Sequence, residues 1–298
     1  MSLSLSVESA VARLEESRKL HPSTKKTDAG SGSSPPSTLP DWPASSRGVP
    51  NVALRSALFS SSRSNRYLER AEIFAQNPTS IRYTGQRLNQ VDHNVWITLL
   101  HVCRANNLGL PFRSSAYVLL KLQGKTDTGP NRGVLYRCLA RLTATAIEIS
   151  DGKRSYTGSL IDEFYRDEET GELVIELNPK LTGLFGREGF THIDWSVRRQ
   201  LTHKPLSQWL HGYFASHADP FPVSIKTLMN MAGSDDACPA SAERNLKRAL
   251  AALAEAHKSL GQAFSYEICE GKVYVRKRPT GSQHRHLRKK LGRQNLAD

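Results

Sequence analysis

Arginine and lysine side chains recur at helical spacing in two separate segments of this 298-residue chain. Residues 131–142 read NRGVLYRCLARL, and residues 242–253 read AERNLKRALAAL. At roughly 100° per residue, three leucines of each segment fall on one stripe and most of the basic residues fall away from it. Guanidinium and ammonium groups bind phosphate oxygens and guanine edges. The pattern therefore predicts two helices that pack by an apolar face and contact nucleic acid by a basic one.

The basic faces supply the residues predicted to contact DNA. Arginines suit guanine edges or phosphates, and a tyrosine among them suits stacking or the positioning of a phosphate. The candidates are Arg132, Tyr136, Arg137 and Arg141 in the first segment and Arg244, Lys247 and Arg248 in the second. For any single helix of this kind, a merely solvated charged face is the simpler interpretation.

A hairpin motif, Glu-Ile-X-Asp/Glu-Gly-Lys, follows each basic segment, at residues 148–153 and 267–272. An acidic residue and a glycine between two apolar strands are typical of a tight β-turn. Lys153, Arg154 and Lys272 at these turns are predicted to contact phosphate or the minor groove. A groove-entering helix followed by a flanking hairpin is the layout of a winged helix-turn-helix. Its repetition favours a tandem DNA reader over two solvated helices.

Further signals order these motifs into two similar units, each reading helix, helix, basic helix, hairpin. The fold class that we expect is therefore α+β, with two tandem winged-helix domains. The elements expected in the first unit are a strand at 81–83, a helix capped by Asn89 or Asp92, a shorter helix from Ser114, the basic helix, hairpin strands at 146–150 and 153–165, and a strand at 173–177 across the turn 167–171. Those expected in the second are helices at 205–217 and 224–231, the basic helix, and strands at 264–269 and 272–276.

The composition of the remaining residues indicates how the chain is divided into segments and domains. Residues 21–50 are dense in Ser, Pro, Gly and Thr, which is typical of a flexible linker. The division that we expect is a disordered N-terminal segment at 1–50, a partner-binding or linker segment at 51–79, winged-helix domains at 80–190 and 191–278, and a basic tail at 279–298.

The charge balance favours a polyanionic partner. The formal net charge is +13, and the isoelectric point is near 9.7. Residues 88–195 carry 12 basic and 13 acidic side chains, whereas residues 196–278 carry 12 basic and 7 acidic ones. The second unit and the tail should therefore supply most of the nonspecific attraction. Because the first unit has an acidic turn at 167–169, its binding should depend more on its fit to the DNA than on nonspecific charge attraction.

The sequence lacks the residues that several other classes of function require. The four cysteines lie far apart without a Cys-X-X-Cys pair, which argues against a zinc ribbon or a secreted disulfide framework. Gly124-Lys125-Thr126 lacks the leading glycine of a phosphate-binding loop, since position 119 is Leu119. No apolar run is long enough for a membrane span, and the start is unlike a signal peptide. We expect no catalytic residues, metal or cofactor, and a cytoplasmic protein that is not an enzyme.

Several longer strings stand out along the chain: LPDWP at 39–43, RGVPN at 47–51, the segment 54–59, IRYTG at 81–85, DGKR at 151–154, RDEETG at 166–171, LNPK at 177–180 and QWLHG at 208–212. These strings, at consistent spacing, resemble the TrfA family of plasmid replication initiators. The resemblance covers roughly residues 39–287 and implies a bacterial protein associated with the nucleoid or a plasmid.

The resemblance implies an initiator that binds direct repeats, the iterons, at a plasmid origin and helps to open adjacent A·T-rich DNA. It implies partners: double-stranded origin DNA, single-stranded DNA, the host replicative helicase, the host initiator and the sliding clamp. It further implies monomers that are active and dimers that are restrained. The family carries a short clamp-binding motif ending in Leu-Phe, which Leu58 and Phe59 match, although Arg55 and Ser56 replace its usual Gln-Leu start.

Two alternatives remain open at the level of sequence. A tandem winged-helix transcriptional repressor would share the same DNA chemistry, bind a palindrome as a stable dimer and need no replication partner. A nicking replication enzyme would need a nucleophile and a metal centre, and strand cleavage with a divalent metal would reveal it. Tandem direct repeats beside an A·T-rich stretch would favour initiation over repression.

Overall fold

A computed structural model describes residues 37–104, 107–150, 155–186 and 189–294. Its buried apolar side chains form two clusters, one within residues 39–195 and the other within residues 197–275. We refer to residues 37–195 as the first unit and to residues 196–294 as the second unit. The polypeptide is a mixed α+β structure in which each unit has its own core.

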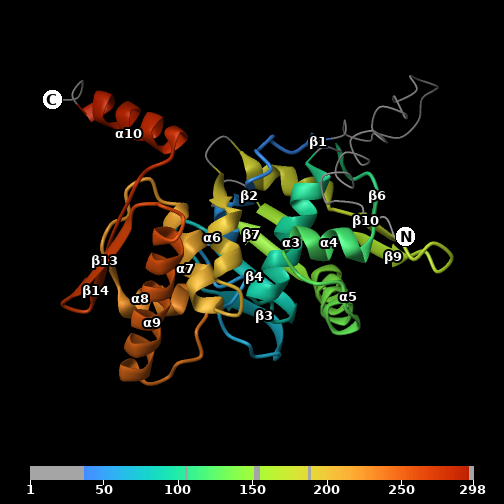
Figure 1. Cartoon of the computed structure of the whole chain (residues 1–298), viewed down its shortest axis with the longest axis horizontal. Coiled ribbons are helices and arrows are strands. Elements are labelled where there is room, and N and C mark those ends of the chain that lie inside the picture. Colours follow the sequence, from blue (N-terminus) through green and yellow to red (C-terminus); the bar gives the residue numbers. More distant parts are fainter. Residues whose placement is uncertain (1–36, 105–106, 151–154, 187–188, 295–298) are drawn as a thin grey trace.

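Helices and strands alternate along both units. The elements of the first unit are β1 (Ser37–Thr38), β2 (Ser46–Pro50), α2 (Asn51–Leu54), β3 (Tyr67–Ile73), β4 (Ser80–Gln86), α3 (Gln90–Cys103), β5 (Asn107–Leu108), β6 (Phe112–Ser114), α4 (Ala116–Leu122), α5 (Gly129–Thr143), β7 (Ala146–Ser150), β8 (Ser155–Gly158), β9 (Glu163–Arg166), β10 (Leu173–Glu176), the 3-10 helix η1 (Pro179–Phe185) and β11 (Phe190–Asp194). Those that follow are α6 (Trp195–Gln200), α7 (Pro205–Ala215), β12 (Val223–Ser224), α8 (Ile225–Met231), α9 (Pro239–Lys258), β13 (Phe264–Cys269), β14 (Lys272–Lys277) and α10 (Gly281–Gln294). Figure 1 shows α5 and α9 on opposite sides of the molecule, with α3, α6 and α7 between them.

Local sequence signals fix where the helices begin. The Asn89 side chain accepts hydrogen bonds from the first turn of α3, and the Asp92 side chain accepts one from the Asn89 N–H at 3.0 Å. This reciprocal arrangement is a capping box, so the expected start of α3 is confirmed. Helix α4 starts later than expected, because Ser114 ends strand β6 and Ser115 is the residue that caps the helix.

Strand order identifies both units as winged helices. In the second unit, α7, β12, α8 and α9 precede the hairpin β13–β14, and β12 pairs with β14. In the first unit, α3, β6, α4 and α5 precede the hairpin β9–β10, and β6 pairs with β10. The two three-stranded sheets therefore share one order, and each hairpin is the wing of its unit. The expected pair of tandem winged helices is confirmed by this shared connectivity.

The repeated Glu-Ile motif does not mark equivalent hairpins, contrary to expectation. In the second unit it forms the wing, β13–β14. In the first unit, β7 and β8 lie in a four-stranded sheet of order β3-β4-β7-β8, where Ile149 of β7 pairs with Ile81 of β4. Because β4 pairs with the other edge of β7, and Ile147 and Ile149 are buried in the first core, this hairpin is part of the four-stranded sheet and not a wing. The wing of the first unit is β9–β10, with the acidic turn 167–171 at its tip.

Residues 37–79 are folded, which corrects two expectations. Strand β2 lies within the segment expected to be disordered, yet it pairs with β11 along its whole length, and Trp42 is buried against the ring of Phe185. The segment 51–79, expected to be a linker, contributes Leu54 and Phe59 to the first core and β3 to the four-stranded sheet. Apolar side chains in both stretches make them part of the first unit. Residues 1–36 of the expected disordered segment lie outside the described residues.

A buried arginine joins the two units. Arg198 on α6 is fully buried, and its guanidinium donates to Asn94 Oδ1 at 2.7 Å, Gln90 Oε1 at 2.8 Å and the Gln208 carbonyl at 2.9 Å. Burial lowers the pKa of Arg198 to about 9. Among the described residues no carboxylate pairs with it, so neutral acceptors from α3 and α7 hold the charge. The contact fixes α6 and α7 of the second unit on α3 of the first.

Further contacts reinforce this junction. The Trp209 indole donates to the Ser56 carbonyl at 3.0 Å, across the boundary between the units. Arg87 of the first unit forms an ion pair of 2.7 Å with Asp235 of the second. A Cβ added at Gly212 on α7 would lie 2.8 Å from Leu54, so glycine allows α7 to approach α2 closely. The units therefore meet through packing and buried hydrogen bonds.

Replacement of the buried guanidinium should destabilise this junction. We expect Arg198→Met to lower the free energy of unfolding by about 2–4 kcal/mol, because it leaves two buried acceptors, on Gln90 and Gln208, and the partly buried Asn94 without their donor. Urea denaturation measures this change. The neighbouring Arg199→Met is the matched control, since Arg199 is exposed, and it should change stability by less than about 0.5 kcal/mol. Equal stability of the two variants would contradict the role assigned to Arg198.

Candidate nucleic-acid interface

Helix α9 presents a basic face beside a buried leucine stripe. Proline at its first position suits the helix start, and Leu246 and Leu250 are buried on its inner side. Arg244, Lys247 and Arg248 are all exposed, as the sequence predicts. Lys247 forms an ion pair of 2.7 Å with Glu243 (side chains about half exposed), and Arg248 donates to Asn245 Oδ1 at 3.0 Å. Surface pairs of this kind are worth less than about 1 kcal/mol, so these side chains remain available to a phosphate or a base.

The wing of the second unit alternates between core and solvent. Val273 and Val275 point inward and are buried, whereas Lys272, Tyr274 and Arg276 are exposed. Lys272 follows Gly271 at the tip, where a φ of +69° favours glycine. Tyr274 and Arg276 share the outer face with Lys272 because side chains alternate along a strand. This period of two could have added both residues to the predicted interface.

The buried positions of helix α5 have the same spacing as those of α9. These positions are Leu135, Cys138, Leu139 and Leu142 in α5 and Leu246, Ala249, Leu250 and Leu253 in α9. In this register Arg137 corresponds to Arg248, and both side chains are exposed. The structure therefore places one exposed arginine at the same position of each third helix.

Two other candidates on α5 are less accessible than expected. Arg132 donates to both carboxylate oxygens of Asp127, at 2.6 and 2.7 Å, and this hydrogen bonding lowers the pKa of Asp127. The carboxylate occupies the fork of the guanidinium that would otherwise face a phosphate. Tyr136 is partly buried and packs against the first core. Arg137 is therefore the most open of the candidates on this helix.

Arg141 lies at the edge of the core rather than on the free face, which corrects the sequence-based placement. Its guanidinium binds Asp92 Oδ1 at 2.7 Å, with 17% of the arginine side chain and none of the aspartate exposed. Burial alone would lower the pKa of Arg141, but the hydrogen bonds and negative charge of Asp92 raise it. The residue ties α5 to the first turn of α3, so we exclude it from the candidate interface.

The wing of the first unit offers few cations. Tyr165 and Arg166 are exposed on β9, and the following turn is acidic. Arg113 of β6 lies 3.7 Å from Asp167 and 3.4 Å from Glu172, so it partly offsets this charge. The predicted contacts Lys153 and Arg154 lie outside the described residues.

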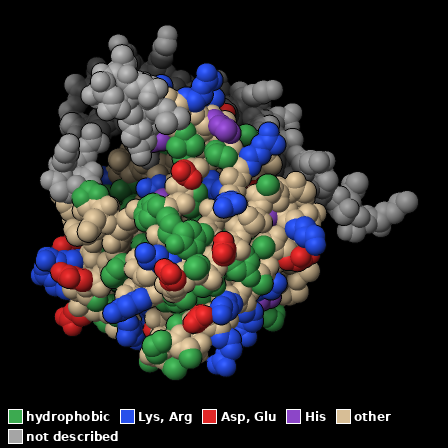
Figure 2. Space-filling model, turned by 90° about the vertical axis from the view of Figure 1, so that its left-hand side faces the viewer, with side chains coloured by type: hydrophobic (Ala, Val, Ile, Leu, Met, Phe, Trp, Pro, Cys, Tyr) green, Lys and Arg blue, Asp and Glu red, His purple; other side chains and the backbone are tan. Residues whose placement is uncertain are grey.

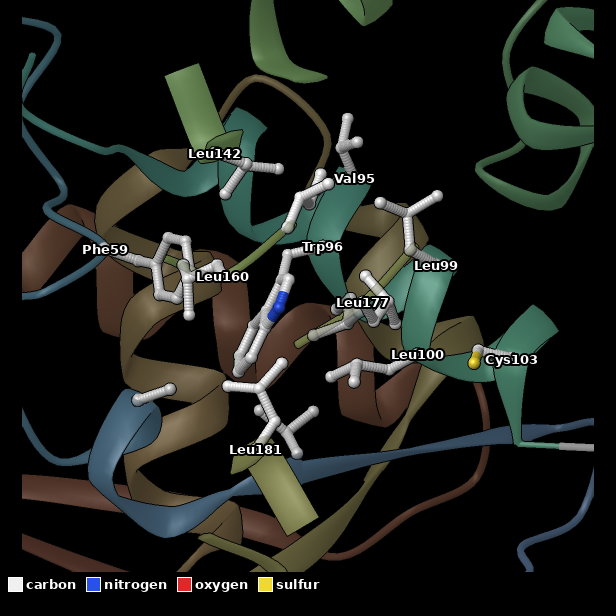
Figure 3. Packing of buried hydrophobic residues seen from close by; sticks show 14 of the residues in the cluster. Phe59, Val95, Trp96, Leu99, Leu100, Cys103, Leu142, Leu160, Leu177 and Leu181 are labelled. Carbon is white, nitrogen blue, oxygen red and sulfur yellow. The ribbon is translucent and has the colours of Figure 1, made fainter. Parts of the chain in front are cut away.

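Leu58 and Phe59 are buried, which contradicts their expected role in clamp binding. Phe59 has no exposed surface and stacks on His93 at 4.3 Å and on Trp96 at 5.4 Å between ring centroids. Figure 3 shows its ring pointing into the core that surrounds Trp96. A partner protein must reach both side chains of such a motif, and here they are part of the fold.

Among the described residues, no three His, Cys, Asp or Glu side chains are grouped as metal ligands, and none of the helices has the length and hydropathy of a membrane span. Figure 2, which views the side formed by the second unit, shows Lys and Arg spread around an apolar centre among Asp and Glu. Binding on this side must therefore depend on particular side chains rather than on one dense basic patch.

A known protein family and an individual known protein both show sequence similarity to this chain. A family model described as TrfA protein matches residues 36–260. The plasmid replication initiator protein TrfA of Escherichia coli is 29% identical over 204 residues, which are 65% of this chain and 53% of that protein. The chain thus spans about half the length of this relative.

Two solved structures are among those that resemble this chain. Domains 2–3 of RctB cover 76% of this chain and 96% of their own, with 12% identity and a TM-score of 0.49. The Pi initiator protein in complex with iteron DNA covers 65% and 96%, with 15% identity and a TM-score of 0.43. The fold assignment itself depends on the strand order and helix contacts described above.

The two equivalent arginines should contribute directly to DNA affinity. We expect Arg137→Ala or Arg248→Ala to weaken binding to the specific duplex by about 1–3 kcal/mol, because each removes an exposed guanidinium from a third helix. Fluorescence anisotropy at physiological salt measures the change. Lys258→Ala, at the exposed end of α9, is the control and should bind as the wild type does. Wild-type affinity of both arginine variants would exclude these helices as readers.

Proposed function

This chain belongs to the TrfA family, and we propose that it is a plasmid replication initiator that binds directly repeated sites, the iterons, at a replication origin. The observation that carries the proposal is the pair of winged helices with an exposed arginine at one shared position, Arg137 and Arg248. The buried contact around Arg198 holds the two readers together. Two readers on one chain suit two successive grooves of one duplex site.

The two units contribute differently to this binding. Arg244, Lys247 and Arg248 of α9 combine with Lys272 of the wing, and each neutralised phosphate steepens the salt dependence by about 0.9 log units. On α5, Arg137 is the open cation, and the neighbouring wing is acidic. The second unit therefore anchors the protein, and the first unit discriminates between sequences by fit.

Origin opening is the second part of the proposed function. Several copies bound to adjacent iterons would convert binding energy into deformation of the DNA, and smooth bending of a site costs of the order of 1–6 kcal/mol. The adjacent A·T-rich segment would then open, giving single-stranded DNA as a further ligand. In this proposal opening is stoichiometric and the host helicase and host initiator are recruited to it. The active form is the monomer, and dimers restrain initiation.

A minimal-origin experiment tests this function. We expect the protein to protect tandem direct repeats beside an A·T-rich stretch from nuclease digestion, because both readers engage each repeat. The gene, supplied in trans, should support replication of a plasmid carrying that origin alone. A variant carrying both Arg137→Ala and Arg248→Ala is the control and should lose both activities. Protection of a palindrome, with no support of replication, would instead indicate a repressor and contradict the proposal.

A further inference from the structure

A cleft of about 630 Å³ lies between the two units. Residues 61–63 of the first unit line one side, and the start of α7 and the middle of α9 line the other. A smaller hollow of about 230 Å³ shares Arg63 and His203 with the cleft and reaches Lys125 in the turn between α4 and α5. Together the hollows connect the helix-turn-helix of the first unit with the third helix of the second.

The cations that line these hollows are not compensated by carboxylates. Among the described residues, no ion pair involves Arg63, Lys125, Lys204 or Arg248. Arg63 donates to the His203 carbonyl at 3.3 Å, which directs it toward the turn before α7. Burial lowers the pKa of Lys125, so a bound anion would favour its charged form.

The carboxylates of the cleft, in contrast, already have partners within the protein. Asp235 pairs with Arg87 at 2.7 Å and accepts a hydrogen bond from Ser62. Asp236 accepts two hydrogen bonds of 3.0 Å from the Asn245 amide. Arg87 thus neutralises Asp235, and among the described residues that line the cleft Asp236 is the one carboxylate without a basic partner, against the three cations Arg63, Lys204 and Arg248. The cleft should therefore attract an anion.

We propose that this cleft binds the sugar-phosphate backbone of duplex DNA between the segments read by α5 and α9, with Arg63 and Lys204 contacting phosphates. The inference rests on the proposed function and adds a site to it. Both side chains are exposed at the mouth of the cleft, and α5 and α9 lie on opposite sides of the molecule (Figure 1). The hollows adjoin both helices, because Arg248 of α9 lines the cleft and Lys125, shortly before α5, lines the smaller hollow.

The lining favours a duplex backbone over a nucleotide or a single strand. No Phe, Tyr or Trp is among the described residues that line either hollow. Bases of single strands and of nucleotides are commonly held by stacking on aromatic rings. Ser61, Ser62, Arg63 and Lys204 instead offer hydroxyl, guanidinium and ammonium donors, which suit phosphate oxygens.

The test compares a double variant, Arg63→Ala/Lys204→Ala, with the wild type in anisotropy titrations of iteron and scrambled duplexes over a range of salt. Loss of two phosphate contacts should reduce the slope of log K against log salt by about 1.8. Affinity should fall by the same factor for both duplexes, since phosphate contacts carry no sequence information. Arg63→Lys/Lys204→Arg keeps both charges and should retain the wild-type slope.

Matched controls exclude a general charge effect. Arg82→Ala/Lys180→Ala removes two exposed cations outside the cleft and should leave the slope unchanged. Thermal unfolding of all variants verifies that they fold. Phosphate-ethylation interference should show phosphates between the two base-contact segments whose modification blocks the wild type but no longer affects the Arg63→Ala/Lys204→Ala variant.

Two results would overturn the inference and are distinguishable from failure of the proposed function. An unchanged salt slope in the Arg63→Ala/Lys204→Ala variant, with iteron preference intact in the wild type, would exclude the cleft as a backbone site. Tight binding of inorganic phosphate without DNA, together with that unchanged slope, would identify a small-anion site instead. If the wild type shows no preference for iterons over scrambled DNA, the proposed function fails and this inference fails with it.

Discussion

The first five residues of α3 are the segment on which the arrangement of this protein depends. Gln90 and Asn94 accept hydrogen bonds from Arg198, a fully buried guanidinium that belongs to the second unit. Asp92, between them, closes the capping box and pairs with Arg141 of α5. This short segment thus contacts both the second unit and the third helix of the first. Burial of the Arg198 guanidinium without its acceptors would be costly, so separation of the two units is unfavourable.

This junction determines what the two readers can do together. Two winged helices on a flexible tether would adapt to different spacings, whereas two helices held through α3 and α6 present one spacing. In the proposed function, the junction holds the exposed Arg137 and Arg248 at a fixed separation, with the proposed backbone site, Arg63 and Lys204, in the cleft between the units. Rigidity of this kind favours specificity, because a duplex must match both helices at once.

Local sequence patterns were enough to predict the helices α3, α5, α7, α8 and α9 and the basic face of α9, whereas α2, α6 and α10 were not predicted. The leucine stripe at Leu246 and Leu250, and the cap at Asn89, are determined by neighbours a few residues away. The paired winged helices followed from these elements and from the resemblance to TrfA initiators. The long-range contacts of individual residues could not be predicted from such local patterns.

Three cases show why these contacts were missed: Arg141, Phe59 and the first hairpin. Arg141 lies away from the leucine stripe, yet a partner 49 residues distant, Asp92, withdraws it from solvent. Phe59 lies in a short motif that resembles a clamp-binding motif, but its ring stacks on Trp96 in the core. Only the folded structure shows this contact. The hairpin at 148–153 has the motif of a wing, but pairing of β7 with β4 makes it part of another sheet. In each case a long-range contact outweighs the local signal.

DNA spacing tests whether the junction holds the two proposed readers rigidly. The measurement is the affinity for an iteron with five base pairs inserted between the segments protected by α5 and α9, compared with the natural site. Five base pairs rotate one segment by about half a helical turn relative to the other. We expect at least a tenfold loss of affinity, because the fixed units can no longer reach both segments. Equal affinity for both duplexes would show that the units move independently and would contradict a rigid junction.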